Sequence, residues 1–135
     1  MCGYYYSYNV PIIKIANSIM LRGPEAFNKL DYDNEHFGHA LLSTRGSSPQ
    51  QPIQNNSGTL VYNGSTYNSA HNDTQWIIDN LDHSVETTVD LIKSLVGEYS
   101  LTYVTDTHIV FCVDQWSSKN LFSYLYMGHT QICSL

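Results

Sequence analysis

Four runs rich in β-branched and aromatic residues follow one another near the end of the chain: YSLTYVT (99–105), HIVFCVD (108–114), NLFSYLYM (120–127) and HTQICSL (129–135). Such side chains fit the pleated, half-buried surface of a sheet. Short polar segments at Asp106, Ser117–Ser118 and Gly128–His129 separate the runs. The pattern therefore predicts four strands joined by short turns.

The residues before these runs predict a mixture of strands and helices. We expect strands in GYYYSY (3–8), HFGHALLST (36–44) and TLVYN (59–63), and helices in PIIKIANSIML (11–21), TQWIIDNL (74–81) and SVETTVDLIKSLV (84–96). Asn72–Asp73 and Ser84 can cap the last two helices. Asn63–Gly64 is typical of a hairpin turn, and the polar stretch 46–58 predicts a loop. Helices set apart from antiparallel strands indicate an α+β layered domain rather than a parallel nucleotide-binding sheet.

Length, charge and hydropathy limit the function. With 135 residues the chain is expected to be a single domain, 1–135. A net charge of −6, with only six Lys and Arg, argues against a nucleic-acid partner, because phosphate binding needs clustered cations. No segment has the eighteen or so apolar residues of a membrane span, and the start does not resemble a secretory signal. We therefore expect a cytoplasmic protein.

The candidate metal and cofactor residues do not form a recognisable motif. His36 and His39 are three apart on a predicted strand, which places them on opposite faces, so we expect no metal site. No glycine-rich phosphate loop is present, and we expect no cofactor. Cys112 and Cys133 are typical of buried strand residues.

Cys2 is different, because only the initiator Met1 precedes it. We expect Met1 to be removed, since the second residue is small, which would leave a cysteine with its own free α-amino group. An α-amine has a pKa of about 7.7–8.0 and a thiol about 8.5, so the two groups are matched for proton exchange near neutral pH. One residue could then supply a nucleophile and a general base.

Other fragments occur in a fixed order along the chain: MCG (1–3), LRGPEAF (21–27), GHALLSTRG (38–46), QQP (50–52), VYNGSTYN (61–68), NDTQ (72–75), GEYSLTYV (97–104) and VFCVDQWSSKNLFSYLY (110–126). In this order they resemble the glutaminase domain of class II glutamine amidotransferases, in particular that of the asparagine synthetase family. The resemblance covers nearly the whole chain and depends on the collinear order of the fragments. It implies a compact version of the four-layer αββα sandwich of N-terminal-nucleophile (Ntn) hydrolases, with antiparallel sheets.

The resemblance also implies roles for individual residues. Cys2 would attack the side-chain amide of glutamine to give a thioester and ammonia. Asn63, through its side chain, and Gly64, through its backbone N–H, would form the oxyanion hole. Asp73 would bind the substrate α-ammonium, although an Asp in this position is also typical of a helix N-cap.

The chain departs from the family pattern at Ser65, at Arg45 and at Val113–Asp114, where the family usually has Arg–Asp. Ser65 stands where the family usually has a Glu beside the ammonium, so recognition of glutamine is weakened unless another acid, such as Asp33 or Glu35, substitutes. Arg45 is expected to bind the substrate α-carboxylate, because a guanidinium can do so with two hydrogen bonds. It comes four residues later than in many asparagine synthetases, where this chain has Leu41. Arg22 is expected to support the turn after the first helix.

The chain has no SGGxDS pyrophosphatase loop, so by this resemblance it cannot activate an acceptor. We therefore expect a separate ATP-dependent synthetase chain, resembling asparagine synthetase or 7-cyano-7-deazaguanine synthase, to receive the ammonia. Two alternatives stay open: an Ntn amidase acting on another amide, and an Ntn-fold binding subunit that is weakly active or inactive.

Overall fold

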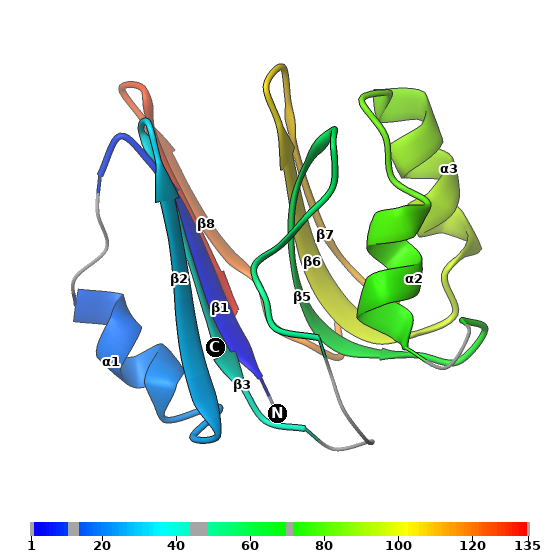
Figure 1. Cartoon of the computed structure of the whole chain (residues 1–135), viewed down its shortest axis with the longest axis horizontal. Helices are drawn as coiled ribbons and strands as arrows, with labels where there is room; N and C mark the ends of the chain where they lie inside the picture. The colour runs from blue at the N-terminus through cyan, green and yellow to red at the C-terminus, as the bar shows by residue number, and fades with distance from the viewer. Residues whose placement is uncertain (1, 11–13, 44–48, 70–71, 135) are drawn as a thin grey trace.

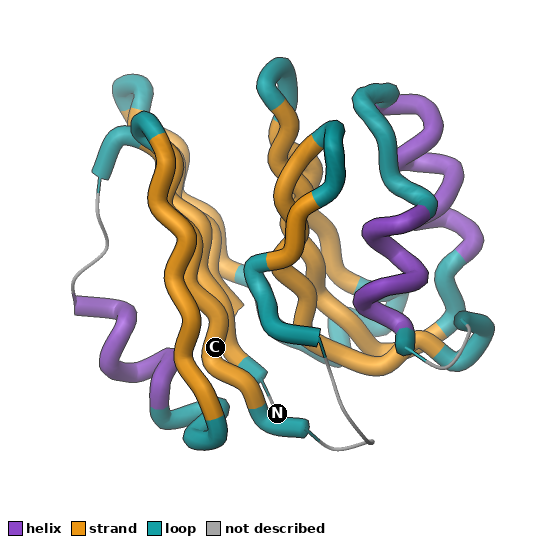
Figure 2. The backbone as a smooth tube through the Cα atoms, viewed as in Figure 1, coloured by secondary structure: helices purple, strands orange, loops and turns teal. Residues whose placement is uncertain are grey.

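Two antiparallel sheets lie face to face, and helices flank their outer sides (Figures 1 and 2). The computed structural model describes residues 2–10, 14–43, 49–69 and 72–134. Every strand pairing in these residues is antiparallel. The chain therefore has the α+β class expected from the sequence.

Sheet A contains the N-terminal strand and the last strand of the chain. Its order is β2 (Ala26–Tyr32), β3 (Glu35–Leu41), β1 (Gly3–Tyr8), β9 (His129–Ser134) and β8 (Phe122–Tyr126). β1 is central, with Gly3 opposite Ala40 on β3 and Tyr4 opposite Ser134 on β9. Residues from the beginning of the chain are therefore held on both sides.

Sheet B is built from the middle of the chain. Its order is β4 (Ile53–Gln54), β5 (Gly58–Thr66), β6 (Gly97–Thr105) and β7 (Ile109–Val113). β5 and β6 pair along their whole length, whereas β4 covers only Thr59 and Leu60 on the other edge of β5. Among the described residues, the second half of β5 therefore has no neighbouring strand on that edge.

In the part of the chain that the structure describes, three helices lie on the outside. α1 (Lys14–Met20) runs along sheet A, and α2 (Asp73–Asp79) and α3 (Val85–Ser94) cover sheet B (Figure 1). Asn72 caps α2 by accepting the N–H of Gln75, and Ser84 caps α3 by accepting the N–H of Thr87. These contacts confirm the capping positions predicted from the sequence.

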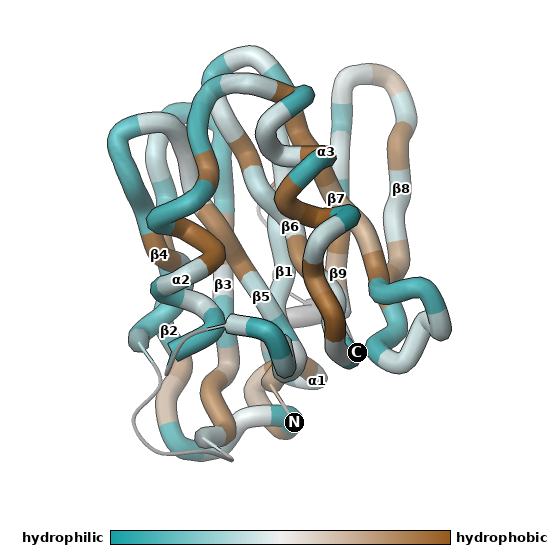
Figure 3. The backbone as a smooth tube through the Cα atoms, turned by 90° about the vertical axis from the view of Figure 1, so that its right-hand side faces the viewer, coloured by the Kyte–Doolittle hydropathy of each residue, from teal (hydrophilic) through white to brown (hydrophobic). Residues whose placement is uncertain are grey.

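Buried side chains of the described residues form three hydrophobic cores. The first lies between α2, α3 and sheet B, where hydrophobic parts of both helices lie over the sheet (Figure 3). The second lies between the two sheets and includes Tyr4, Phe37 and Val61. The third joins Ile19 of α1 to Tyr5 of β1. Strand alternation therefore sends Tyr4 and Tyr5 into different cores.

The structure corrects three expectations. Residues 26–32 form the edge strand β2, which the sequence pattern did not predict because few of its side chains are buried. The predicted turn at Asn63–Gly64 is wrong: both residues lie inside β5. The short turn predicted at Ser117–Ser118 is instead a longer connection, over residues 114–121, that leads from β7 of sheet B to β8 of sheet A.

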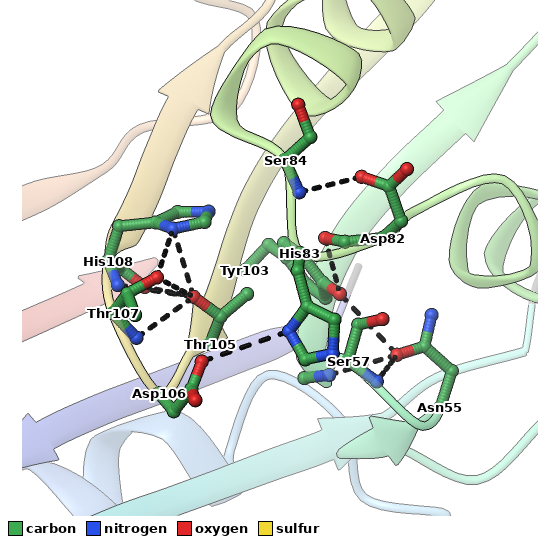
Figure 4. Close-up of polar contacts among 11 residues, drawn as sticks. Asn55, Ser57, Asp82, His83, Ser84, Tyr103, Thr105, Asp106, Thr107 and His108 are labelled. Carbon is green, nitrogen blue, oxygen red and sulfur yellow. Dashed lines mark hydrogen bonds and ion pairs between the residues drawn. The ribbon is translucent and has the colours of Figure 1, made fainter.

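A cluster of polar contacts lies at the end of sheet B where a turn connects β6 to β7 (Figure 4). The Tyr103 hydroxyl donates to the Asp82 carbonyl at 3.2 Å, which fixes the α2–α3 connection to the sheet. His83 and Asp106 form a solvent-exposed pair at 3.8 Å. These contacts connect the loop between α2 and α3 to β6 and to the turn between β6 and β7.

Candidate active site

Cys2 lies immediately before β1, at the end of sheet A. Its Sγ accepts a hydrogen bond from the Leu42 N–H at 3.3 Å and lies 3.5 Å from the Leu42 carbonyl. By strand alternation Cys2 shares a face with Tyr4, which belongs to the core between the sheets. The thiol is therefore held against the backbone that follows β3, on the side that faces sheet B.

The environment of Cys2 keeps its sulfur protonated. Burial raises the pKa of the Cys2 thiol, and the negative charges of Glu25 and Asp73 add to this rise, whereas the Leu42 N–H and the positive charge of the N-terminus lower the pKa by less than burial raises it. A thiol with a raised pKa is a poor nucleophile unless a base removes its proton.

Asn63 and Gly64 sit in the second half of β5, opposite Ser100 and Tyr99 of β6. Asn63 is 3% exposed and, by alternation from Val61, its side chain belongs to the face that points toward sheet A. Gly64 has a φ of +153°, a conformation that favours glycine. The two neighbouring residues of β5 therefore combine a side-chain amide that faces sheet A with a backbone conformation that favours glycine.

The backbone of Gly64 points away from β6. Tyr99 donates its N–H to Asp114 Oδ2 at 3.0 Å, and its carbonyl accepts the Asp114 N–H at 2.9 Å. Because both backbone groups of Tyr99 are used on the β7 side, Gly64 and Tyr99 form a non-hydrogen-bonded pair. The N–H of Gly64 is thus directed away from β6, to the same edge of β5 that pairs with β4, but beyond the residues that β4 covers.

Side chains hold the N–H groups on either side of Gly64. The Tyr62 N–H donates to Gln51 Oε1 at 2.6 Å, and the Thr66 N–H donates to Asp73 Oδ2 at 3.1 Å. Both lie on the same edge of β5 as the Gly64 N–H, because alternate residues of a strand direct their backbone groups to the same side. Side chains therefore hold this edge of β5 at Tyr62 and Thr66, and the Gly64 N–H lies between them.

Asp73 is the first residue of α2 and does not cap it, since Asn72 has that role. Its Oδ2 also accepts the Tyr62 hydroxyl at 3.3 Å, and its Oδ1 accepts the Thr74 N–H at 2.8 Å. The carboxylate therefore joins α2 to β5. A carboxylate has about four acceptor sites, so a further donor can still bind.

Ser65 lies next to Gly64 and opposite Glu98 of β6. By strand alternation the Glu98 side chain is on the same face as that of Ser65, and it pairs with Lys119 at 3.7 Å. The suggested substitute acids are wrong: Glu35 is opposite Tyr8, at the other end of β1 from Cys2, and Asp33 lies in the turn just before it.

Of the two arginines, Arg22 lies within the described residues. Arg45 lies outside the described residues. Arg22 follows α1, where its N–H donates to the Ile19 carbonyl at 2.9 Å. Its side chain lies against Gly3, since a Cβ on that glycine would be 3.1 Å from the Cβ of Arg22. The expected support of the turn after α1 by the Arg22 side chain therefore stays a prediction.

Two further residues reach the edge of β5, and no local sequence pattern predicts their contacts. Gln51 precedes β4 and binds Tyr62, and His39 of β3 binds the Tyr62 carbonyl through Nε2 at 3.2 Å. His36, on the opposite face of β3, pairs instead with Asp31 at 2.8 Å. Among the described residues, no group of three or more His, Cys, Asp or Glu could hold a metal ion.

Comparison with known proteins gives a match at the level of the fold. No family model matches the chain, and no curated protein matches it. Among solved structures, it is similar to glutamine phosphoribosylpyrophosphate (PRPP) amidotransferase from B. subtilis, solved in complex with ADP and GMP. The TM-score is 0.75 at 15% identity, over 98% of this chain and 41% of the amidotransferase chain. The chain therefore has the fold of part of a glutamine amidotransferase and spans less than half of its length.

Proposed function

We propose that this chain is a glutaminase of the Ntn kind, with Cys2 as the nucleophile. The observation that carries the proposal is the open edge of β5, where the Gly64 N–H lies between two N–H groups that side chains already hold. Cys2 contacts Leu42 just after β3, and His39 of β3 contacts the Tyr62 carbonyl on this edge. These contacts support a site in which the thiol and the directed backbone donor act together, in a chain whose fold is similar to that of an amidotransferase.

The chemistry follows from these groups. After Met1 is removed, the Cys2 α-amine takes the thiol proton, and Sγ forms a bond to the amide carbon of glutamine. Asn63 and the Gly64 N–H stabilise the oxyanion, a contribution of about 3–4 kcal/mol for each donor. The protonated amine then gives its proton to the leaving nitrogen, the C–N bond breaks, and ammonia departs. Water hydrolyses the thioester to glutamate and restores the thiol.

Recognition of the substrate amino acid is assigned to residues around this edge. Asp73 would bind the α-ammonium and Arg45 the α-carboxylate. Ser65 lacks the carboxylate usual at its position, and we propose that Glu98, directly across from it, supplies that charge instead of Asp33 or Glu35. For this, the Glu98 carboxylate would have to leave its ion pair with Lys119. The side chain of Glu98 is 53% exposed, so it is free to reorient.

The layered arrangement supports a compact αββα Ntn sandwich, since three separate cores lie between a helix, two sheets and two further helices.

We propose that the ammonia passes to a separate ATP-dependent synthetase chain resembling asparagine synthetase or 7-cyano-7-deazaguanine synthase. No helix in the described part of the chain has the length and apolar character of a membrane span.

Ser65 also favours a second candidate, an Ntn amidase that acts on an amide without an α-ammonium group. Release of ammonia from glutamine, compared with release from simple carboxamides, separates this candidate from the first. An inactive binding subunit would release none from either.

The test is modification by a glutamine-mimicking diazoketone followed by intact-mass analysis. We expect loss of Met1, one adduct on Cys2, and no adduct in Cys2→Ala. We also expect Cys2→Ala to lower glutamine hydrolysis by about 10³-fold or more, with an unchanged circular-dichroism spectrum. Cys112→Ala is the matched control, because Cys112 lies in β7 of sheet B and packs against the core under the helices.

The outcomes are distinct. Hydrolysis by Cys2→Ala at a rate near that of the wild type would place the nucleophile elsewhere. Met1 retained on the protein from its native cell would exclude both enzymatic candidates.

A further inference from the structure

His39 is a fully buried residue for which the mechanism above has no use. Its exposed fraction is 0%, and it lies on β3 in the face that points toward sheet B. Its Nε2 lies 3.2 Å from the Tyr62 carbonyl. A carbonyl can only accept, so Nε2 carries the proton and donates it, and Nδ1 is an acceptor.

The imidazole is held as a neutral donor. Burial lowers the pKa of His39 to about 4, so the ring is uncharged at neutral pH. Nδ1 has no hydrogen-bond partner among the described residues, and the same is true of Nδ2 of Asn28, directly opposite on β2. Buried polar groups without partners destabilise a fold. At position 39, an apolar side chain would therefore be expected to give a more stable fold. The histidine differs from such a side chain by its hydrogen bond to the Tyr62 carbonyl.

We propose, resting on the proposed glutaminase function, that His39 is a positioning residue that orients the Tyr62–Asn63 peptide and through it the two oxyanion donors. The Tyr62 carbonyl and the Asn63 N–H belong to one planar unit. Fixing that plane sets the direction in which the Asn63 side chain leaves the strand and the position of the next N–H, that of Gly64.

The strand edge explains why a side chain is needed. Over residues 59–60 the strand β4 holds this edge of β5, but it does not extend to Tyr62. There, Gln51 holds the Tyr62 N–H and His39 holds its carbonyl, while Asp73 holds the Thr66 N–H. Three side chains from three segments thus replace a strand partner and leave the N–H of Gly64 for a ligand.

The test compares three substitutions of His39 in the full chain. His39→Gln places an amide N–H near the position of Nε2, His39→Asn places one near Nδ1, and His39→Leu has no donor. We expect His39→Leu and His39→Asn to lower the kcat of glutamine hydrolysis by about 10–100-fold, with KM within about threefold, because a displacement near 1 Å can cost 10²-fold in rate. His39→Gln is expected to stay within about fivefold of the wild type.

Hydrogen exchange of the β5 segment gives a second readout that does not depend on activity. We expect faster amide exchange around Asn63–Gly64 in the Leu and Asn variants and near-normal exchange in His39→Gln. Should His39→Leu fail to fold, the Gln and Asn pair still carries the comparison.

The two proposals fail in different ways. A wild-type chain that releases no ammonia from glutamine overturns the proposed function, and exchange alone then decides whether His39 holds the peptide. An active wild type with equal kcat in the Gln and Asn variants, or a fully active Leu variant, overturns the role of His39 only.

Discussion

At the scale of single residues, Gly64 combines a positive φ with close backbone neighbours. A Cβ at this position would overlap the Glu98 carbonyl and lie 2.6 Å from the Tyr99 Cα. The strand cannot move away easily, because β5 pairs with β6 along its whole length. The glycine is therefore required by the pairing, whatever chemistry its N–H performs.

We expect Gly64→Ala to lower the free energy of unfolding by about 3 kcal/mol, since both backbone strain and overpacking contribute. Gly128→Ala is the matched control: Gly128 also has a positive φ, of +78°, but a Cβ there would meet only Asn9 Nδ2 at 3.9 Å. Its loss should be nearer to about 1 kcal/mol, from the left-handed conformation alone. Urea unfolding measures both, and equal losses would contradict a role for the close contacts.

At the scale of elements, Asp114 organises the connection between β7 and β8. Its Oδ1 accepts the Trp116 N–H at 2.9 Å, and its Oδ2 accepts those of Tyr99 at 3.0 Å and Ser118 at 3.1 Å. Burial raises the pKa of the Asp114 carboxyl, but these hydrogen bonds outweigh it, and the pKa lies below its usual value. The same contacts occupy the backbone of Tyr99 and so keep Gly64 unpaired on that side.

A folded-state pKa below the unfolded value of about 3.9 means that Asp114 stabilises the fold above about pH 4 and that this stability is lost as the pH falls further. We expect Asp114→Asn to lower the free energy of unfolding by about 2 kcal/mol at pH 7, and the difference from wild type to shrink near pH 3. Asp106→Asn, in the exposed β6–β7 turn, should change little. An Asp114→Asn deficit that is the same at both pH values would contradict this account.

At the scale of the whole molecule, tyrosines fill all three cores. Tyr4 joins the sheets through a 3.2 Å hydrogen bond to Thr102 Oγ1 on β6. Burial raises the pKa of Tyr99 to about 12. It also raises the pKa of six other tyrosines: Tyr4, Tyr5, Tyr6, Tyr32, Tyr62 and Tyr103.

Raised pKa values mean that the neutral phenols are favoured in the fold. Their contribution to stability is complete below the unfolded pKa of about 10 and is lost as the pH rises above it. We therefore expect alkaline unfolding in which tyrosinate absorbance and loss of circular dichroism rise together. The chain in concentrated urea, as a control, should titrate near pH 10. Complete ionisation near pH 10 with a native circular-dichroism spectrum would show that the tyrosines are not buried.

Local patterns in the amino-acid order were sufficient for much of the architecture. Tyrosine content predicted β1, β-branched and aromatic content predicted the strands near the end, and the caps at Asn72 and Ser84 predicted the starts of α2 and α3. These features depend on neighbours within a few residues, which a single sequence displays.

Long-range pairing determined the rest. Asn63–Gly64 has a strong preference for a turn, yet pairing with β6 keeps it within a strand. The edge strand β2 has too few buried side chains to show a clear pattern. The contacts of Gln51, His39 and Asp114 join residues that are 11 to 23 positions apart. Hydrogen bonds between such residues have no local periodicity, so the donors on the edge of β5 appear only when both sheets are assembled.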